Sequence, residues 1–158
     1  MPECEVLAPA GSLESLIAAI NCGADAVYVG GKKFSARQNA ANFDNEELKK
    51  AADICHLHGV KIYLTVNTLI FDSQIKEFCE LIRYAAEYGI DAFIVQDVGA
   101  AEIIKNIIPD AHIHGSTQMT VHTIKGAELL KKLGFKRAVL SRELNGGQIA
   151  EIVKVGIE

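Results

Sequence analysis

One phrase recurs four times along the chain and constrains its fold more than any other feature. A glycine is followed by one small or apolar residue, a charged residue and a short β-branched or aromatic run, starting at Gly23, Gly59, Gly89 and Gly134. Each copy follows a segment with helical periodicity, and a glycine at that place adopts the positive φ that ends a helix. Each apolar run is typical of a buried parallel strand. The repeated unit is therefore a helix, a glycine and a strand.

Two more strands fit this cycle without the glycine phrase, at residues 5–8 and 111–115. Capping signals support the helices between the strands: Asp44 is followed by Glu47, Asp72 precedes residue 75, and Asn145 is followed by Gln148. Strict alternation of strand and helix predicts right-handed crossovers and a parallel sheet covered by helices. The predicted helices are 13–22, 45–58, 75–88, 98–107, 124–133 and 147–155.

Two α/β architectures accommodate six such units: a doubly wound sheet and part of an eightfold barrel. Polar residues end nearly every predicted strand instead of gathering at one switch point, which favours a parallel (β/α) TIM-type barrel. Residues 155–158 look like the lead-in to another strand. We therefore expect about six of eight strand-helix units, forming a single incomplete domain over residues 1–158 that continues beyond Glu158. The open sheet edges would allow a homodimer.

Composition excludes several classes of function. The chain of 158 residues is 49% hydrophobic and 23% charged, as expected of a globular domain, and its net charge of −4 argues against a surface built to neutralise nucleic-acid phosphates. No apolar run is long enough to span a membrane, so we expect a cytoplasmic protein. The cysteines are widely spaced and are expected to be reduced thiols, and no metal-binding motif is present. The four cysteines are Cys4, Cys22, Cys55 and Cys79.

Large polar side chains follow the predicted strands, where ligands bind in parallel α/β folds. Some of them will be helix caps or turn residues, but as a group they would lack hydrogen-bond partners unless they held one another or a ligand. The candidates for substrate binding are Arg37, Asn67, Gln96, Asp97, Gln118 and Arg142.

Ser116 is the candidate nucleophile, and two histidines are candidate bases for it. His114 lies two residues away on the same strand face, roughly 6 to 7 Å from Ser116, which is long for a hydrogen bond. His122 would approach by chain reversal. Glu143 completes the candidate catalytic set, as a group that holds or polarises a substrate carbonyl.

Several sequence motifs of this chain, taken in order, resemble the amino-terminal part of the collagenase-like peptidases of unknown catalytic type. This bacterial family also contains RNA-hydroxylation proteins and proteins of oxygen-independent ubiquinone synthesis. The resemblance covers nearly the whole chain and rests on residues 7–14, 23–31, 34–37, 42–43, 66–69, 95–97, 116–119, 122 and 140–144.

The resemblance implies one of two activities. One is a peptidase acting on a protein or peptide, and the other is a tRNA or rRNA hydroxylation enzyme or subunit in which Arg37 or Arg142 clamps a small oxygen-donating metabolite. A structural fragment without activity is the third alternative. The hydroxylation and ubiquinone relatives hold an iron-sulfur cluster through cysteines after the seventh strand, and none of the four cysteines here matches them. We expect no cofactor in this chain, whereas a full-length parent protein could hold a cluster.

Overall fold

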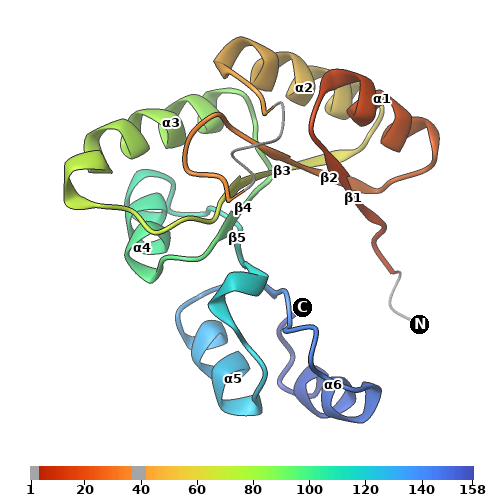
Figure 1. The fold of residues 1–158 in the computed structure, drawn as a ribbon, viewed down its shortest axis with the longest axis vertical. Helices are drawn as coiled ribbons and strands as arrows, with labels where there is room; N and C mark the ends of the chain where they lie inside the picture. The colour runs from red at the N-terminus through yellow and green to blue at the C-terminus, as the bar shows by residue number, and fades with distance from the viewer. Residues whose placement is uncertain (1–3, 37–41) are drawn as a thin grey trace.

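The computed structural model describes residues 4–36 and 42–158. Its strands form one parallel sheet whose spatial order is the order of the sequence (Figure 1). A doubly wound sheet reverses its strand order at a switch point, so the consecutive order and the TIM-type barrel prediction agree. The strands are β1 (Leu7–Ala10), β2 (Ala26–Gly30), β3 (Lys61–Val66), β4 (Ala92–Val95), β5 (Ile113–Gly115) and β6 (Arg137–Ala138).

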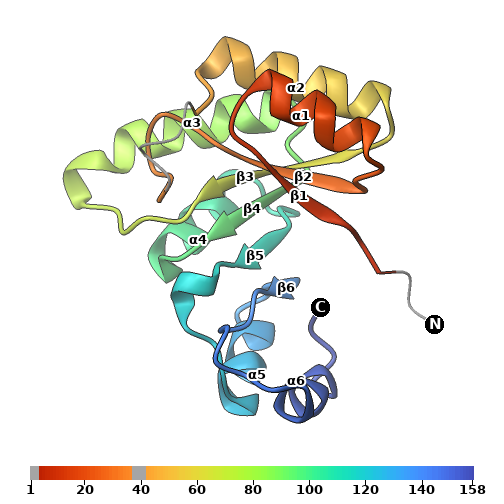
Figure 2. The same ribbon diagram turned by 45° about the vertical axis from the view of Figure 1, so that its right-hand side comes forward.

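The helices lie on the outer side of the curved sheet, as Figure 2 shows, and none of the described helices is long and apolar enough to cross a bilayer. All six fall within two residues of their predicted bounds. They are α1 (Leu13–Asn21), α2 (Asn45–Leu57), α3 (Ile75–Glu87), α4 (Val98–Ile107), α5 (Ile124–Lys132) and α6 (Gly146–Val153), with short 3₁₀ turns η1 (Asp72–Gln74) and η2 (Thr117–Met119).

The glycines of the repeated phrase end their helices as predicted. Their φ angles are 85° at Gly23, 68° at Gly59, 76° at Gly89 and 78° at Gly134, a region that glycine enters without a steric cost. This conformation turns the chain from each helix into the next strand. The prediction that these four glycines adopt a positive φ at the ends of helices is confirmed.

Two of the predicted caps are confirmed and one is wrong. Asp44 and Asn145 each cap a helix through a complete capping box. Asp72 does not cap α3, because it begins the 3₁₀ turn η1 and the residue before α3 makes no side-chain capping bond. The extra turn separates Asp72 from the first helical amide groups.

The first strand begins two residues later than predicted. Residues 5–8 were expected, but the ladder runs over Leu7–Ala10 and includes Pro9. Proline is tolerated here because β1 is an edge strand, where its missing N–H costs no bond on the open side. Glu5 lies outside the ladder and takes part in ion pairs.

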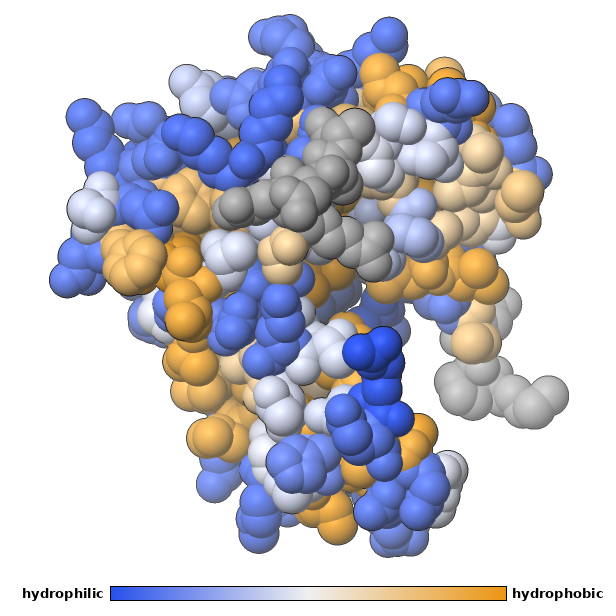
Figure 3. Space-filling view, in the orientation of Figure 1, coloured by the Kyte–Doolittle hydropathy of each residue, from blue (hydrophilic) through white to orange (hydrophobic). Residues whose placement is uncertain are grey.

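The alternation of side chains divides the apolar residues into two cores. The larger core lies between the sheet and the helices, and it includes Val27, Leu64, Phe78 and Ile82. Hydrophilic side chains cover the outer surfaces of α2 and α3 (Figure 3), as expected of helices with one buried face. The smaller core lies on the inner face of the sheet and consists of Ala26, Tyr63, Ala92 and Ile94, with Leu7 and Tyr28 packed against it.

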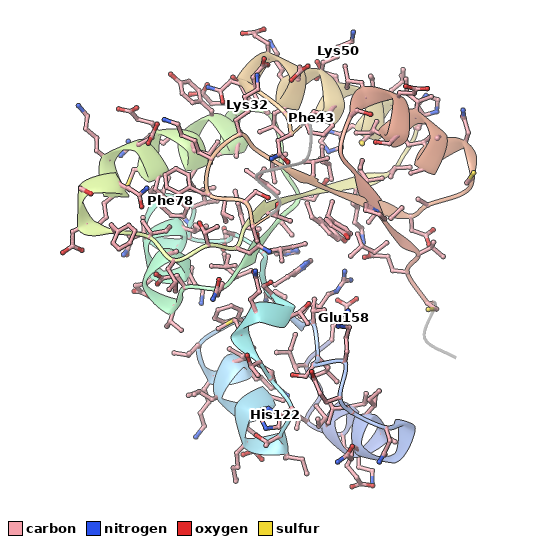
Figure 4. All side chains as sticks on the ribbon, viewed as in Figure 1. Lys32, Phe43, Lys50, Phe78, His122 and Glu158 are labelled. Atoms are coloured by element: carbon pink, nitrogen blue, oxygen red, sulfur yellow. The ribbon has the colours of Figure 1, made fainter. Side chains whose placement is uncertain are left out.

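Ionic and polar contacts occupy the amino-terminal end of the barrel interior. The carboxylate of Glu5 accepts hydrogen bonds from Arg137 Nη1 at 2.7 Å, Lys61 Nζ at 2.9 Å and the Tyr63 hydroxyl at 2.9 Å. Arg137 also pairs with Glu158, which is labelled in Figure 4. These contacts connect Glu5, two residues before β1, with β6 at the opposite edge of the sheet.

The backbone of Glu158 lies alongside β6. Its N–H donates to the carbonyl of Lys136 at 3.2 Å, and its carbonyl accepts from the N–H of Ala138 at 2.8 Å. Gly156, just before it, has a φ of 71°. The order of helix, glycine and extended chain thus recurs after α6.

Candidate functional site

A cavity of about 450 Å³ lies at the carboxyl ends of the strands. Its size is within the range of roughly 300–1,000 Å³ that is typical of small-ligand sites, and its place is where parallel barrels bind ligands. A groove of similar volume, about 480 Å³, lies between residues 31–34 and the helices α2 and α3. The first cavity is therefore the candidate site. It is lined by Leu7, Ala10, Gly11, Tyr28, Gly30, Ser35, Ala36, Asn42, Thr65, Asn67, Ile94, Ser116, Thr117, Gln118 and Val139.

The described lining combines apolar groups with uncharged polar groups. Leu7, Tyr28, Ile94 and Val139 supply apolar surface, while the polar part consists of hydroxyl and carboxamide side chains. None of the described lining residues is an aspartate, glutamate, lysine or arginine. Recognition by these residues therefore depends on hydrogen bonds and shape.

A directed chain of hydrogen bonds crosses one wall of the cavity. The N–H of Ala36 donates to Asn67 Oδ1 at 3.0 Å, and Asn67 Nδ2 donates to Ser116 Oγ at 3.3 Å. The Ser116 hydroxyl donates to Gln118 Oε1 at 3.4 Å and accepts from the Gln118 N–H at 3.4 Å. A backbone N–H is always a donor, so the Ala36 N–H fixes Asn67 Oδ1 as the acceptor and leaves Asn67 Nδ2 to donate to Ser116. The relay ends at the carboxamide of Gln118.

The loop after β2 forms another part of the polar wall. Ser35 Oγ lies 3.1 Å from Thr65 Oγ1, which donates to the carbonyl of Val29 at 3.0 Å. Phe34 holds the loop in place: its φ is 62°, and its buried ring meets the edge of Phe78 at 5.4 Å between centroids. A positive φ in a bulky residue is strained. Packing against α3 therefore fixes a loop conformation that the local sequence disfavours.

A side chain at position 30 would collide with two residues that line the cavity. A Cβ on Gly30 would lie 2.6 Å from Ser35 Oγ and 2.8 Å from Asn42 Oδ1. Both distances are shorter than a non-bonded contact. The glycine therefore lets the loop close over the end of β2.

His114 is buried in the barrel interior and does not line the cavity. It is 4% exposed, and its ring meets the Tyr63 ring edge-on at a centroid distance of 4.8 Å. Burial, with a smaller contribution from the charge of Arg137, lowers the pKa of His114 to about 4. The imidazole is therefore neutral at pH 7. Its Nδ1 has no hydrogen-bond partner among residues 4–36 and 42–158.

Three of the predicted site residues meet in the cavity, namely Asn67, Ser116 and Gln118. Gln96 is half-buried but does not line the cavity. Asp97 does not line it either, because its carboxylate caps α4 through the N–H groups of Gly99 and Ala100 and also accepts from the N–H of Ile70. Asp97 thus fixes the loop after β3.

The remaining predicted residues lie apart from the described lining. His122 is exposed beside α5 (Figure 4), and its Nδ1 lies 2.8 Å from the carbonyl of Thr120. Arg142 and Glu143 are exposed in the turn that follows β6. Arg37 lies outside the described residues. Chain reversal after β5 therefore does not bring His122 into the set of residues that line the cavity with Ser116.

Thr65 and Ser35 are lining residues that the sequence prediction missed. The alternation of side chains along the third strand was a usable signal for Thr65, because the side chain of Thr65 lies on the same face of the strand as that of Tyr63. Ser35 could not be found in this way, because its position depends on how Phe34 packs against α3.

The described residues do not provide ligands for an iron-sulfur cluster. No group of three or more histidine, cysteine, aspartate or glutamate side chains among them is arranged to hold a metal ion. Cys55 is buried, and this burial raises the pKa of its thiol to about 11, whereas Cys4 and Cys22 are exposed elsewhere. A cluster requires thiolates that converge on one place.

The fold is that of a parallel (β/α)-barrel protein, and the cavity at the carboxyl ends of its strands is a candidate site for a small ligand. The model of Peptidase family U32 matches residues 11–158, so the chain belongs to this family. A U32 peptidase of known structure superposes with a TM-score of 0.77 at 14% identity, covering 96% of this chain and 65% of that one. At this identity the likeness concerns the fold alone.

Curated relatives carry names from both RNA modification and proteolysis. The 23S rRNA 5-hydroxycytidine C2501 synthase of Escherichia coli K12 is 40% identical over 94% of this chain and 22% of its own length. The tRNA hydroxylation protein P of Helicobacter pylori 26695 is 41% identical over 98% of this chain and 37% of its own. The collagenase of Porphyromonas gingivalis W83 is 40% identical over 94% of this chain and 35% of its own. The chain thus spans between a fifth and two fifths of these relatives.

Proposed function

We propose that the protein containing this chain takes part in RNA hydroxylation. The observation that carries the proposal is the hydrogen bonding of Ser116, the hydroxyl that a serine peptidase would use. Its oxygen accepts two N–H groups, and its proton is directed to the amide oxygen of Gln118. An amide oxygen is too weak a base to take that proton, and nucleophilic catalysis requires an activating base.

The candidate bases support the same conclusion. His114 is buried below the cavity, whereas His122 and Glu143 are exposed and absent from the cavity lining. The hydroxylation names among the relatives agree with a site that binds a ligand without attacking it. The product of the Escherichia coli relative is a hydroxylated cytidine, and we propose a pyrimidine base of RNA as the substrate class here.

Hydroxylation of a base replaces a C–H bond with C–O–H and removes two electrons from the ring. The reaction therefore needs, in addition to the RNA, a co-substrate that donates the oxygen atom and accepts these two electrons. Arg37 and Arg142 remain proposed clamps for a carboxylate on such a metabolite, since guanidinium groups bind carboxylates through two hydrogen bonds. An iron-sulfur cluster remains a proposal for the full-length protein only.

The test compares nucleosides from cells with and without the gene for the full-length protein. Mass spectrometry of digested rRNA and tRNA is expected to show one pyrimidine that loses the mass of one oxygen atom upon deletion. Wild-type protein should restore it, and Ser116→Ala, which interrupts the relay, should restore it less well. Ser73→Ala alters an exposed serine in η1 and serves as the matched control.

Peptide hydrolysis is the second candidate, favoured by the relatives named collagenase and protease. The purified full-length protein would then cleave gelatin without added metal, and Ser116→Ala or His122→Ala would abolish the cleavage. Such a result, together with unchanged RNA nucleosides after deletion, would refute the hydroxylation proposal.

A further inference from the structure

We propose that a second pocket beside the candidate site binds a nucleotide next to the target nucleotide of the RNA, with Phe71 stacking on its base and Lys33 contacting its phosphate. This rim pocket, about 440 Å³ in volume, lies between residues 32–34 after β2 and residues 68–77 after β3. The inference rests on the proposed role in RNA hydroxylation and names the path of the RNA strand beside the site. It follows from the position of the pocket, its exposed aromatic ring and its charges.

The rim pocket and the candidate cavity are built from the same two chain segments. In the segment after β2, Phe34 lines the rim pocket and Ala36 lines the cavity. In the segment after β3, Leu69 lines the rim pocket and Asn67 lines the cavity. The N–H of Ala36 donates to Asn67 Oδ1 at 3.0 Å, which holds the two segments together. Two residues of chain span at most roughly 7 Å, so a strand whose target lies at the cavity brings an adjacent nucleotide to the rim pocket.

Two apolar side chains of the rim pocket are exposed on an anchored loop. Leu69 is 66% exposed and Phe71 is 72% exposed. The backbone here is fixed, because the N–H of Ile70 donates to Asp97 Oδ2 at 3.3 Å and the N–H of Phe71 donates to Gln74 Oε1 at 3.1 Å. An exposed aromatic ring is a surface on which an unpaired base stacks. Because the loop is already ordered, little conformational freedom is lost when a base binds.

The charges of the rim pocket favour a nucleotide over a neutral aromatic ligand. Its described lining holds Lys32, Lys33 and one carboxylate, that of Glu77. Lys32 pairs with Asp44 at 3.0 Å and Lys33 pairs with Glu77, and both pairs are open to solvent. Exposed ion pairs contribute little to stability, so a phosphate can replace the carboxylate on Lys33. A nucleotide supplies both the flat base for Phe71 and the anion for this lysine, and a single phosphate contact does not require a basic surface.

Fluorescence anisotropy of a fluorescein-labelled uridine decamer, titrated with the purified full-length protein, tests the proposal. Phe71→Ala should weaken binding about tenfold, the effect of losing one side chain that stacks on a base. Leu57→Ala is the matched control, because it removes an apolar side chain that is 83% exposed at the end of α2 that leads into β3. This position lies opposite the carboxyl ends of the strands, so the control variant should bind the decamer as wild type does.

The pair of Lys33 and Glu77 provides a second measurement, in which the two variants should act in opposite directions. Lys33→Gln removes the phosphate contact, so binding should weaken, and the slope of log affinity against log salt should fall in magnitude by about 0.7 between roughly 50 and 200 mM salt. Glu77→Gln removes the competing carboxylate and should tighten binding about two- to fivefold at low salt, the effect of losing one exposed ion pair. An ion pair with only a structural role would make both variants change binding in the same direction.

Two results would overturn the proposal. One is equal affinity of wild type and Phe71→Ala for the decamer; a lower melting temperature of that variant would then show that another part of the full-length protein covers the ring. The other is a change of the same sign in Lys33→Gln and Glu77→Gln. Neither result alters the nucleoside comparison described above. If deletion still removes a hydroxylated pyrimidine while Phe71→Ala binds the decamer as wild type does, RNA hydroxylation stands and only the path of the strand is wrong.

Discussion

Replacing Glu5 with glutamine tests whether the ionic contacts at the amino-terminal end stabilise the open barrel. Partial burial alone would raise the pKa of Glu5, but hydrogen bonds from Arg137, Lys61 and Tyr63 outweigh it and hold the pKa at about 2, against an ordinary value of 4.5. This difference corresponds to at most about 3–4 kcal/mol. The end of the barrel is partly open to water, which screens the charges, so we expect Glu5→Gln to lower the free energy of unfolding by about 1–2 kcal/mol at pH 7.

The dependence on pH separates this effect from a loss of packing. The folded-state pKa lies below the unfolded value, so the stabilisation is fully present above about pH 4.5 and disappears as the pH falls through about 2. The difference between wild type and Glu5→Gln should therefore shrink to less than half at pH 3. Glu102→Gln, at an exposed position of α4, is the matched control.

Urea unfolding of the 158-residue chain, followed by far-ultraviolet circular dichroism because the sequence has no tryptophan, measures both differences. A Glu5→Gln variant as stable as wild type at pH 7 would refute the reasoning. So would a difference in unfolding free energy that stays constant from pH 7 to pH 2, since it would then not depend on the ionised carboxylate.

Two further predictions concern the cavity loop and the thiols. Gly30→Ala should lower the free energy of unfolding by about 1–3 kcal/mol, because its Cβ would clash with Ser35 and Asn42. Gly146→Ala is the control and should not lower it, because its Cβ meets no atom within 4 Å. Equal melting temperatures for the two variants would contradict the packing argument. Cys55 should resist iodoacetamide at pH 8, because the thiol is buried with a pKa of about 11 while Cys4 and Cys22 are exposed. Mass spectrometry of the labelled chain checks this, and labelling of Cys55 as fast as Cys22 would disprove it.

The fold was predictable because each unit carries its own local signals. The four glycines at helix ends and the capping boxes of Asp44 and Asn145 depend on neighbours within a few residues, and the structure confirms them. The limits of β1 were not predictable in this way. They depend on the pairing of β1 with β2, in which Leu7 lies opposite Ala26 and Ala10 opposite Val29.

The site was predictable only in part, because its residues occupy two kinds of position. Asn67 and Ser116 directly follow β3 and β5, and the direction of a strand determines the position of the residue after it. Both residues therefore line the cavity as expected. Asp97 also follows a strand, but the N-terminus of α4 begins at once and takes its carboxylate as a cap. His122 and Arg142 lie farther along their loops, where the path of the chain depends on tertiary packing that periodicity does not describe.

β1 and β6 are the two outermost strands of the sheet, and residues in or next to both of them line the cavity. Leu7 and Ala10 belong to β1, while Val139 follows β6, so more than a hundred residues of sequence separate the opposite walls. A bound ligand would therefore contact both ends of the curved sheet and oppose its flattening. We therefore expect ligand binding at the mouth to restrict changes in the curvature of the sheet.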